Sequence, residues 1–120
     1  MIWNETKECM SRDEMTNLQS ARLRKLVDRV YHSVEYYRKK MQAVGLEPGD
    51  IRGIEDLEKL PFTTKDDLRD TYPFGMFAVP NSQITRIHAS SGTTGKATVV
   101  GYKRKDIDVW SECVARCITM

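Results

Sequence analysis

Apolar residues recur at alternating steps of four and three positions in the first third of the chain, which is the spacing of one apolar stripe on an α-helix. The stripe contains Leu23, Val27, Val30, Val34, Tyr37, Met41 and Val44. Ser11 and Glu14 have the S-x-x-E spacing of a capping box, so the helix is expected to begin there and to end at Gly45. The pair His32-Ser33 could interrupt it, with Ser33 as the N-cap of a second helix. The stripe is expected to pack on the rest of the protein, with a coiled-coil partner as the alternative.

Shorter elements are expected in the middle of the chain. The run EPGD at 47–50 predicts a turn, and apolar residues at every third position over 54–60 predict a short helical segment before Pro61. Thr63 and Thr64 each stand three residues before an aspartate, so another short helix should begin near Lys65. It should end before Tyr72-Pro73, and the apolar residues that follow should form a loop over the core.

A pair of strands and a last helix are expected after position 80. In residues 84–89, Thr85, Ile87 and Ala89 alternate with the basic residues Arg86 and His88, which predicts a strand with His88 on its outer face. Residues 98–102 are rich in amino acids that favour β-strands. The segment between them therefore joins two strands. Beyond it, one helix side beginning near Lys105 contains Ile107, Trp110, Val114, Cys117 and Ile118. No stop signal precedes Met120, which indicates that the sequence continues beyond this point.

The composition limits the classes of function. A length of 120 residues corresponds to about one domain, and 19 basic against 17 acidic residues give a net charge of only +2, which disfavours nucleic acid as a partner. The sequence contains neither a signal-peptide pattern nor an apolar run of membrane-spanning length, so a cytoplasmic protein is expected. The three cysteines are expected to be free thiols, buried or without function. A metal pair formed by Cys113 and Cys117 is the alternative.

The segment HASSGTTGKAT at 88–98 is the candidate for chemistry. Gly92 and Gly95 allow the main chain to approach an anion, the neighbouring serines and threonines add hydroxyl donors, and Lys96 adds a positive charge, so the segment predicts a polyphosphate ligand. It does not fit the Walker pattern, because Ser90 replaces the first glycine and Ala97 replaces the hydroxyl residue after the lysine. A flexible loop without a ligand remains the alternative.

The segment from Ser90 to Thr98 resembles the phosphate-binding signature of the adenylate-forming enzymes. More narrowly, LPFTTKDDLRDTYPFGMFAVP at 60–80, RIHASSGTTGK at 86–96 and TVVGY at 98–102 resemble the opening of the phenylacetate-CoA ligases, and YYRKK at 36–40 fits the same family. Ala97 departs from the proline that is usual in the signature.

The resemblance implies an α/β fold: a helical N-terminal segment at 1–80, followed at 81–120 by the first strands and helix of the large AMP-binding domain. It implies ATP-dependent ligation of phenylacetate or a related aryl acid to coenzyme A through an acyl-adenylate, with Mg²⁺ beside the nucleotide. The phosphate contacts would be Ser90, Ser91, Gly92, Thr93, Thr94, Gly95 and Lys96, with Lys65 as a further candidate.

The family's enzymes are several times longer than this chain. The resemblance therefore implies that the adenine, acyl and coenzyme A contacts and the catalytic lysine lie outside it, and that the chain alone is inactive. The implied partners are small molecules and, in a homodimer, a second copy. No nucleic acid, membrane or metal site is expected. The alternative function is a helical protein-interaction module without ATP chemistry.

Overall fold

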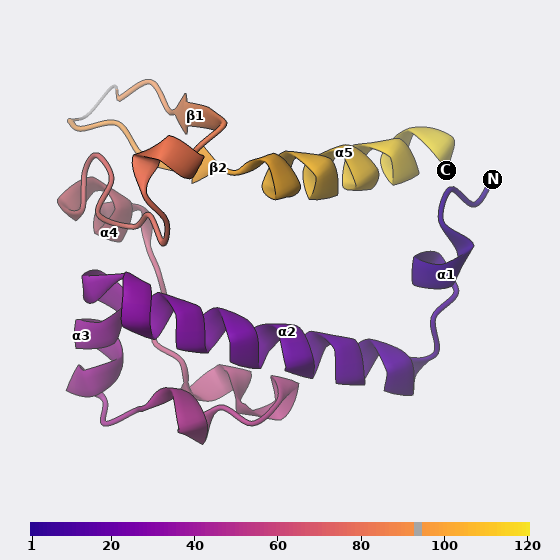
Figure 1. Cartoon of the computed structure of the whole chain (residues 1–120), viewed down its shortest axis with the longest axis horizontal. Helices are drawn as coiled ribbons and strands as arrows, with labels where there is room; N and C mark the ends of the chain where they lie inside the picture. The colour runs from indigo at the N-terminus through magenta and orange to yellow at the C-terminus, as the bar shows by residue number, and fades with distance from the viewer. Residues whose placement is uncertain (93–94) are drawn as a thin grey trace.

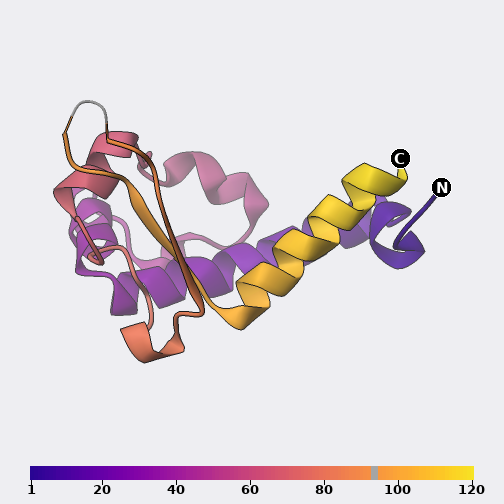
Figure 2. The same cartoon turned by 90° about the horizontal axis from the view of Figure 1, so that it is seen from above.

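The structure is a computed structural model that describes residues 1–92 and 95–120 (Figure 1). A helical part is followed by a two-stranded sheet and a last helix. The elements are α1 (Glu5–Glu8), α2 (Arg12–Ser33), α3 (Glu35–Ala43), η1 (Pro48–Asp50), η2 (Ile54–Lys59), α4 (Lys65–Asp70), η3 (Asn81–Gln83), β1 (Arg86–Ala89), β2 (Val99–Tyr102) and α5 (Arg104–Thr119). Figures 1 and 2 show both termini at the same end of the molecule. Among the described residues, no helix is both long and apolar enough to cross a membrane.

The long helical region begins and ends where the sequence predicts. Ser11 Oγ accepts from the backbone N–H of Glu14, and Glu14 Oε2 accepts from the backbone N–H of Ser11 at 2.9 Å, which completes the capping box. Gly45 has a φ of +72°, and the backbone N–H groups of Gly45 and Leu46 close the last turn onto the carbonyls of Gln42 and Met41. This is the Schellman arrangement, in which glycine is the residue that adopts positive φ without steric cost.

The predicted interruption is present, but the capping residue is not the predicted one. Helix α2 ends at Ser33 and α3 begins at Glu35, and Val34 in extended conformation is the cap of both. The prediction that Ser33 caps the second helix is therefore wrong, since no side-chain cap is found at Val34. Val34 is only 1% exposed, so burial of an apolar side chain places the bend here.

The core lies between α2, α3 and the segment that follows them. Val27, Met41 and Ile51 are buried against one another, and the half-buried residues around them are Leu23, Tyr31, Leu46 and Leu60. The predicted stripe thus packs within the chain itself, except at its last position, where Val44 is 57% exposed.

The sheet consists of the predicted hairpin. Strands β1 and β2 are antiparallel, with Arg86 opposite Tyr102 and Ala89 opposite Val99. One face is covered by the loop after α4, where the Phe77 ring lies directly over Gly101, so that a Cβ at position 101 would meet the ring at 2.5 Å. This confirms the predicted role of the 74–80 loop as a cover.

The other face of the hairpin carries an aromatic cluster. His88 lies with its ring 5.1 Å from that of Tyr102 and 5.5 Å from that of Trp110, and the last two rings are 5.6 Å apart. The expectation that His88 points outward is therefore wrong, because α5 crosses this face and brings Trp110 over it. Ile87, on the opposite face, is the more exposed residue at 50%.

Helix α5 is held at its start and at its middle. Its first residue follows β2 after Lys103, and its middle is fixed to the N-terminal segment through Glu112, which accepts from Trp3 Nε1 at 3.1 Å and from Asn4 Nδ2 at 2.8 Å. These hydrogen bonds hold the pKa of Glu112 below its usual value. Arg116, one turn later, donates to the same carboxylate. Residues at opposite ends of the sequence are thus joined in space.

Candidate phosphate-binding hairpin

The neck of the hairpin is closed by side-chain and backbone hydrogen bonds. The Ser90 N–H donates to the Thr98 carbonyl at 3.0 Å, the Thr98 N–H donates to Ser90 Oγ at 3.2 Å, and the two hydroxyl oxygens lie 2.7 Å apart. Ser90, a predicted phosphate contact, is therefore engaged in closing the loop. These hydrogen bonds give Ser90 a structural role in addition to any contact with a ligand.

The two glycines of the loop are required by its backbone. Gly95 has a φ of +132°, a region that residues with a side chain rarely adopt. A Cβ on Gly92 would lie 2.4 Å from the Gly95 carbonyl oxygen, so the main chain on the two sides of the loop approaches more closely than any other residue would allow. At these two positions the main chain carries no side chain, the feature that allows peptide N–H groups to approach an anion closely.

The polar groups of the loop face solvent. Ser91, Gly92, Gly95 and Lys96 are all exposed. Among the described residues no ion pair or side-chain hydrogen bond of Lys96 is found. Thr93 and Thr94, the other two predicted contacts, lie outside the described residues.

Lys96 is the one charged residue of the loop in the sequence, whereas Arg86 and Lys103 flank the strands at their other end, and the neighbouring α4 contains Asp66, Asp67 and Asp70. The sequence has no acidic residue between Asp70 and Asp106, whereas the basic residues Arg86, Lys96, Lys103, Arg104 and Lys105 all fall in that interval.

Lys65 is the first residue of α4 and is exposed. Figures 1 and 2 both show α4 beside the end of the hairpin where β1 ends and β2 begins. The Thr64–Asp67 capping box predicted from the sequence is formed, and the competing Thr63–Asp66 pair is not. Helix α4, which begins with Lys65, thus lies near the loop end of the hairpin.

Sequence reasoning missed a contact below α4. Lys40 of α3 lies with its ammonium group 2.8 Å from Asp67 Oδ2, and it also donates to the Phe62 carbonyl. The signal that could have found it is weak: Lys40 lies in the YYRKK segment, and nothing in the spacing pairs it with a residue 27 positions later.

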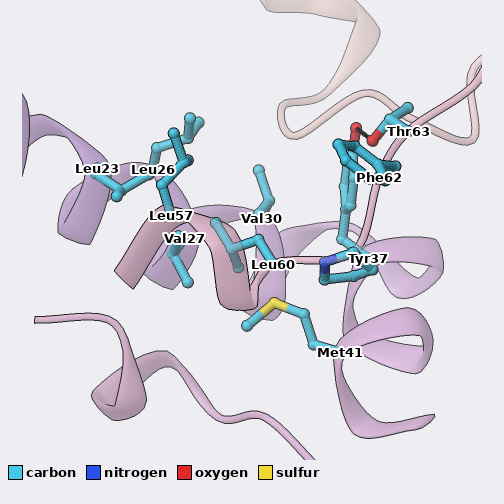
Figure 3. A pocket seen from close by; sticks show the side chains of 11 residues that line it. Leu23, Leu26, Val27, Val30, Tyr37, Met41, Leu57, Leu60, Phe62 and Thr63 are labelled. Atoms are coloured by element: carbon cyan, nitrogen blue, oxygen red, sulfur yellow. Dashed lines mark hydrogen bonds between the residues drawn. The ribbon is translucent and has the colours of Figure 1, made fainter. Parts of the chain in front are cut away.

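An apolar concave region of about 450 Å³ lies on the helical part (Figure 3). Its walls come from α2, α3 and the segment from η2 to Thr63, and they consist of Leu23, Leu26, Val27, Val30, Tyr37, Met41, Leu57, Leu60, Pro61, Phe62 and Thr63. The lining includes no charged side chain, and its polar groups are the paired hydroxyls of Tyr37 and Thr63. Such a groove does not suit a polyphosphate.

The described residues contain no group of three His, Cys, Asp or Glu side chains arranged to hold a metal ion. The three cysteines are free, as expected, and all are exposed, so of the two expected states, buried or without function, burial does not apply. Cys113 and Cys117 share a face of α5 without a third ligand among the described residues.

Curated relatives match nearly all of this chain. It is 55% identical over 114 residues to the phenylacetate-coenzyme A ligase of Aromatoleum evansii and 49% identical over 118 residues to that of Thermus thermophilus, which covers 95% and 98% of the chain. The Escherichia coli enzyme of the same name is 54% identical over 111 residues. The chain spans about a quarter of the length of each relative, 26%, 26% and 25%. No family model matches the chain.

Solved structures agree with the fold. A 2-hydroxyisobutyryl-CoA ligase, in complex with 2-HIB-AMP and CoA, superposes with a TM-score of 0.86 at 32% identity, over 96% of this chain and 25% of the ligase. An open conformation of the same ligase gives a TM-score of 0.83. The predicted fold class, a helical segment followed by the first hairpin and helix of an adenylate-forming enzyme, is thereby confirmed. The chain is a homologue of the phenylacetate-CoA ligases, and it has the fold of about one quarter of an adenylate-forming CoA ligase.

Proposed function

We propose that this chain supplies the phosphate-binding part of an enzyme that joins phenylacetate, or a related aryl acid, to coenzyme A with the use of ATP. The observation that carries the proposal is the bare-backbone loop at Gly92 and Gly95, in a chain whose relatives are named phenylacetate-coenzyme A ligases. Residues 1–80 would form the helical N-terminal segment, and residues 81–120 the start of the AMP-binding domain.

The loop would act by position and charge. In the first half-reaction, the carboxylate of the acid attacks the α-phosphorus of ATP and pyrophosphate leaves, which yields the acyl-adenylate. The loop amides, together with the hydroxyls of Ser91, Thr93 and Thr94 and the ammonium group of Lys96, would bind the β- and γ-phosphates and stabilise the charge of the leaving pyrophosphate. Mg²⁺ bound to the nucleotide supplies further neutralisation. The proposal assigns no general acid or base to this chain.

Lys65 would add a second ammonium group for the terminal phosphate. The support for this role is that α4 lies beside the end of the hairpin and that Lys65 is exposed on its first turn (Figure 2). Ser90 would hold the neck of the loop through Thr98, and its contribution to phosphate binding would be mainly indirect.

The rest of the reaction belongs to parts of the ligase that this chain does not match. The adenine, acyl and coenzyme A sites and the catalytic lysine would lie in the remaining three quarters of the relatives' length. A homodimer and a cytoplasmic location stay predictions.

The activity can be tested in a chimera in which this chain replaces the matching quarter of the Thermus thermophilus ligase. We expect pyrophosphate release and aryl-CoA formation only when ATP, phenylacetate and coenzyme A are all present. Lys96→Ala should lower kcat/KM for ATP by about 10- to 100-fold, since it removes one preorganised charge from the leaving group. Lys25→Ala on exposed α2 is the control and should leave it unchanged. Normal ATP use by the Lys96→Ala enzyme would contradict the proposal.

A further inference from the structure

The ion pair between Lys40 and Asp67 differs from the others in this molecule. Among the described residues, every other ion pair joins side chains three or four positions apart, whereas Lys40 and Asp67 are 27 positions apart. Both side chains are largely withdrawn from water, with 28% and 16% of their surface exposed. The pair therefore connects two elements, α3 and α4, at a protected position.

Asp67 has two functions at once. Its Oδ2 atom accepts from the backbone N–H of Thr64 at 2.7 Å, which caps α4, and from Lys40 Nζ at 2.8 Å. The Lys40 ammonium and then the Tyr36 hydroxyl hold the pKa of Asp67 well below its usual range. Conversely, the Asp67 carboxylate raises the pKa of Lys40. Both groups are therefore charged at neutral pH.

One ammonium group thus fixes the chain on both sides of Lys65. Lys40 Nζ donates to the carbonyl of Phe62, before α4, and to Asp67, within its first turn. Helix α4 has no buried residue of its own, so little apolar packing holds its first turn in place. Lys40 with its two partners Phe62 and Asp67, called the clamp below, supplies that restraint, and Lys65 lies between these two partners in the sequence.

We propose that Lys40 is a positioning residue for the phosphate site: through Asp67 it holds the first turn of α4 so that Lys65 reaches the phosphates of a nucleotide bound at the hairpin. This inference rests on the function proposed above. Lys40 itself does not touch the nucleotide in this scheme, because its ammonium group is occupied by Phe62 and Asp67.

The test is a titration of the 120-residue chain with Mg²⁺·ATP, followed by the amide signals of an NMR spectrum. Lys40→Met and Asp67→Asn should each raise the Kd about three- to fivefold, the size of one exposed ion pair to the ligand. Asp67→Asn is the discriminating variant. It removes a negative charge from the neighbourhood of a polyanion, so a purely electrostatic effect would tighten binding, whereas loss of the clamp weakens it.

Three further variants complete the test. Lys39→Met removes the same charge from the same helix, but from an exposed pair with Glu35, and should leave the Kd within about twofold. Lys40→Arg retains charge and donors and should restore binding. The double variant Lys40→Met/Lys65→Ala should bind as weakly as Lys65→Ala alone, because the clamp acts through Lys65.

The outcomes separate the two proposals. If Lys65→Ala weakens binding but Asp67→Asn tightens it, or if Lys40→Met adds fully to Lys65→Ala, the clamp is refuted while the phosphate site stands. If neither Lys96→Ala nor Lys65→Ala changes the Kd, the proposed function fails, and the clamp fails with it. Should Lys40→Met lose its folded spectrum, Asp67→Asn decides alone, since its amide oxygen can still accept from Thr64.

Discussion

The proposed binding of phosphate by the loop is tested most directly by adding one methyl group at Gly92. In Gly92→Ala, the new Cβ would lie 2.4 Å from the Gly95 carbonyl oxygen, whereas a C···O contact needs about 3.3 Å. The two sides of the loop must therefore separate by about 0.9 Å, and the obstacle is backbone, which cannot rotate away as a side chain can. We expect this displacement to disrupt the convergence of loop amides on a phosphate.

The size of the expected loss of affinity can be worked out more directly for Gly95. Gly95→Ala would force a residue with a Cβ to a φ of +132°, a conformation that costs about 1–3 kcal/mol. The native loop conformation would lose about 5- to 150-fold in population, and the apparent Kd for Mg²⁺·ATP would rise as the competent fraction falls. For Gly92→Ala we expect the apparent Kd for Mg²⁺·ATP to rise about tenfold, because the steric clash also lowers the population of the native loop conformation.

The assay is Mg²⁺·ATP titration together with urea unfolding, and Gly49→Ala is the matched control. A Cβ at position 49 meets no atom within 4 Å, so this variant should bind as the parent does. Both loop variants should unfold at nearly the parent urea concentration, because the loop is exposed and lies outside the core. Parent-like affinity in both variants would refute the reasoning, since the bare backbone would then not be what binds.

Three further outcomes are expected from urea unfolding. Ser11→Ala should lower the free energy of unfolding by about 1 kcal/mol through loss of the capping box, while Ser33→Ala, which removes no cap, should change it by less than about 0.5 kcal/mol. The folded pKa of Asp67 is depressed, so its contribution to stability is present above the unfolded pKa of about 4 and is lost as the pH falls below it. Asp67→Asn should therefore flatten the decline in unfolding free energy between pH 5 and about pH 2. Ile51→Ala should cost about 2–5 kcal/mol because Ile51 is 2% exposed, and Ile118→Ala, at 78% exposed, should cost far less.

Local interactions explain what the sequence could predict. The capping boxes at Ser11 and Thr64 and the positive-φ end at Gly45 each depend on atoms a few residues apart, so the order of residues is sufficient to locate them. The hairpin could be predicted for the same reason, since its strands flank one short loop. The phosphate signature belongs to this class as well, although the role of its residues stays a prediction.

Contacts between distant parts of the chain could not be predicted from the sequence. The prediction of a Ser33 cap failed because burial of Val34 outweighed the local preference for a hydroxyl, and only the folded core reveals that burial. His88 turned inward because Trp110 arrives from another element. The Lys40–Asp67 pair and the Trp3–Glu112 hydrogen bond depend on separations of 27 and 109 positions, for which a single sequence carries no signal.

The described contacts that shape the loop lie within the hairpin and α5, so its proposed phosphate binding can be tested on this chain alone. The Ser90–Thr98 bonds close the neck, the two glycines shape the turn, and His88 packs beneath it with Tyr102 and Trp110. All these contacts lie between residues 86 and 110. Because these loop contacts are local, we expect the chain to bind a polyphosphate weakly by itself, with Lys65 and its clamp adding to that affinity.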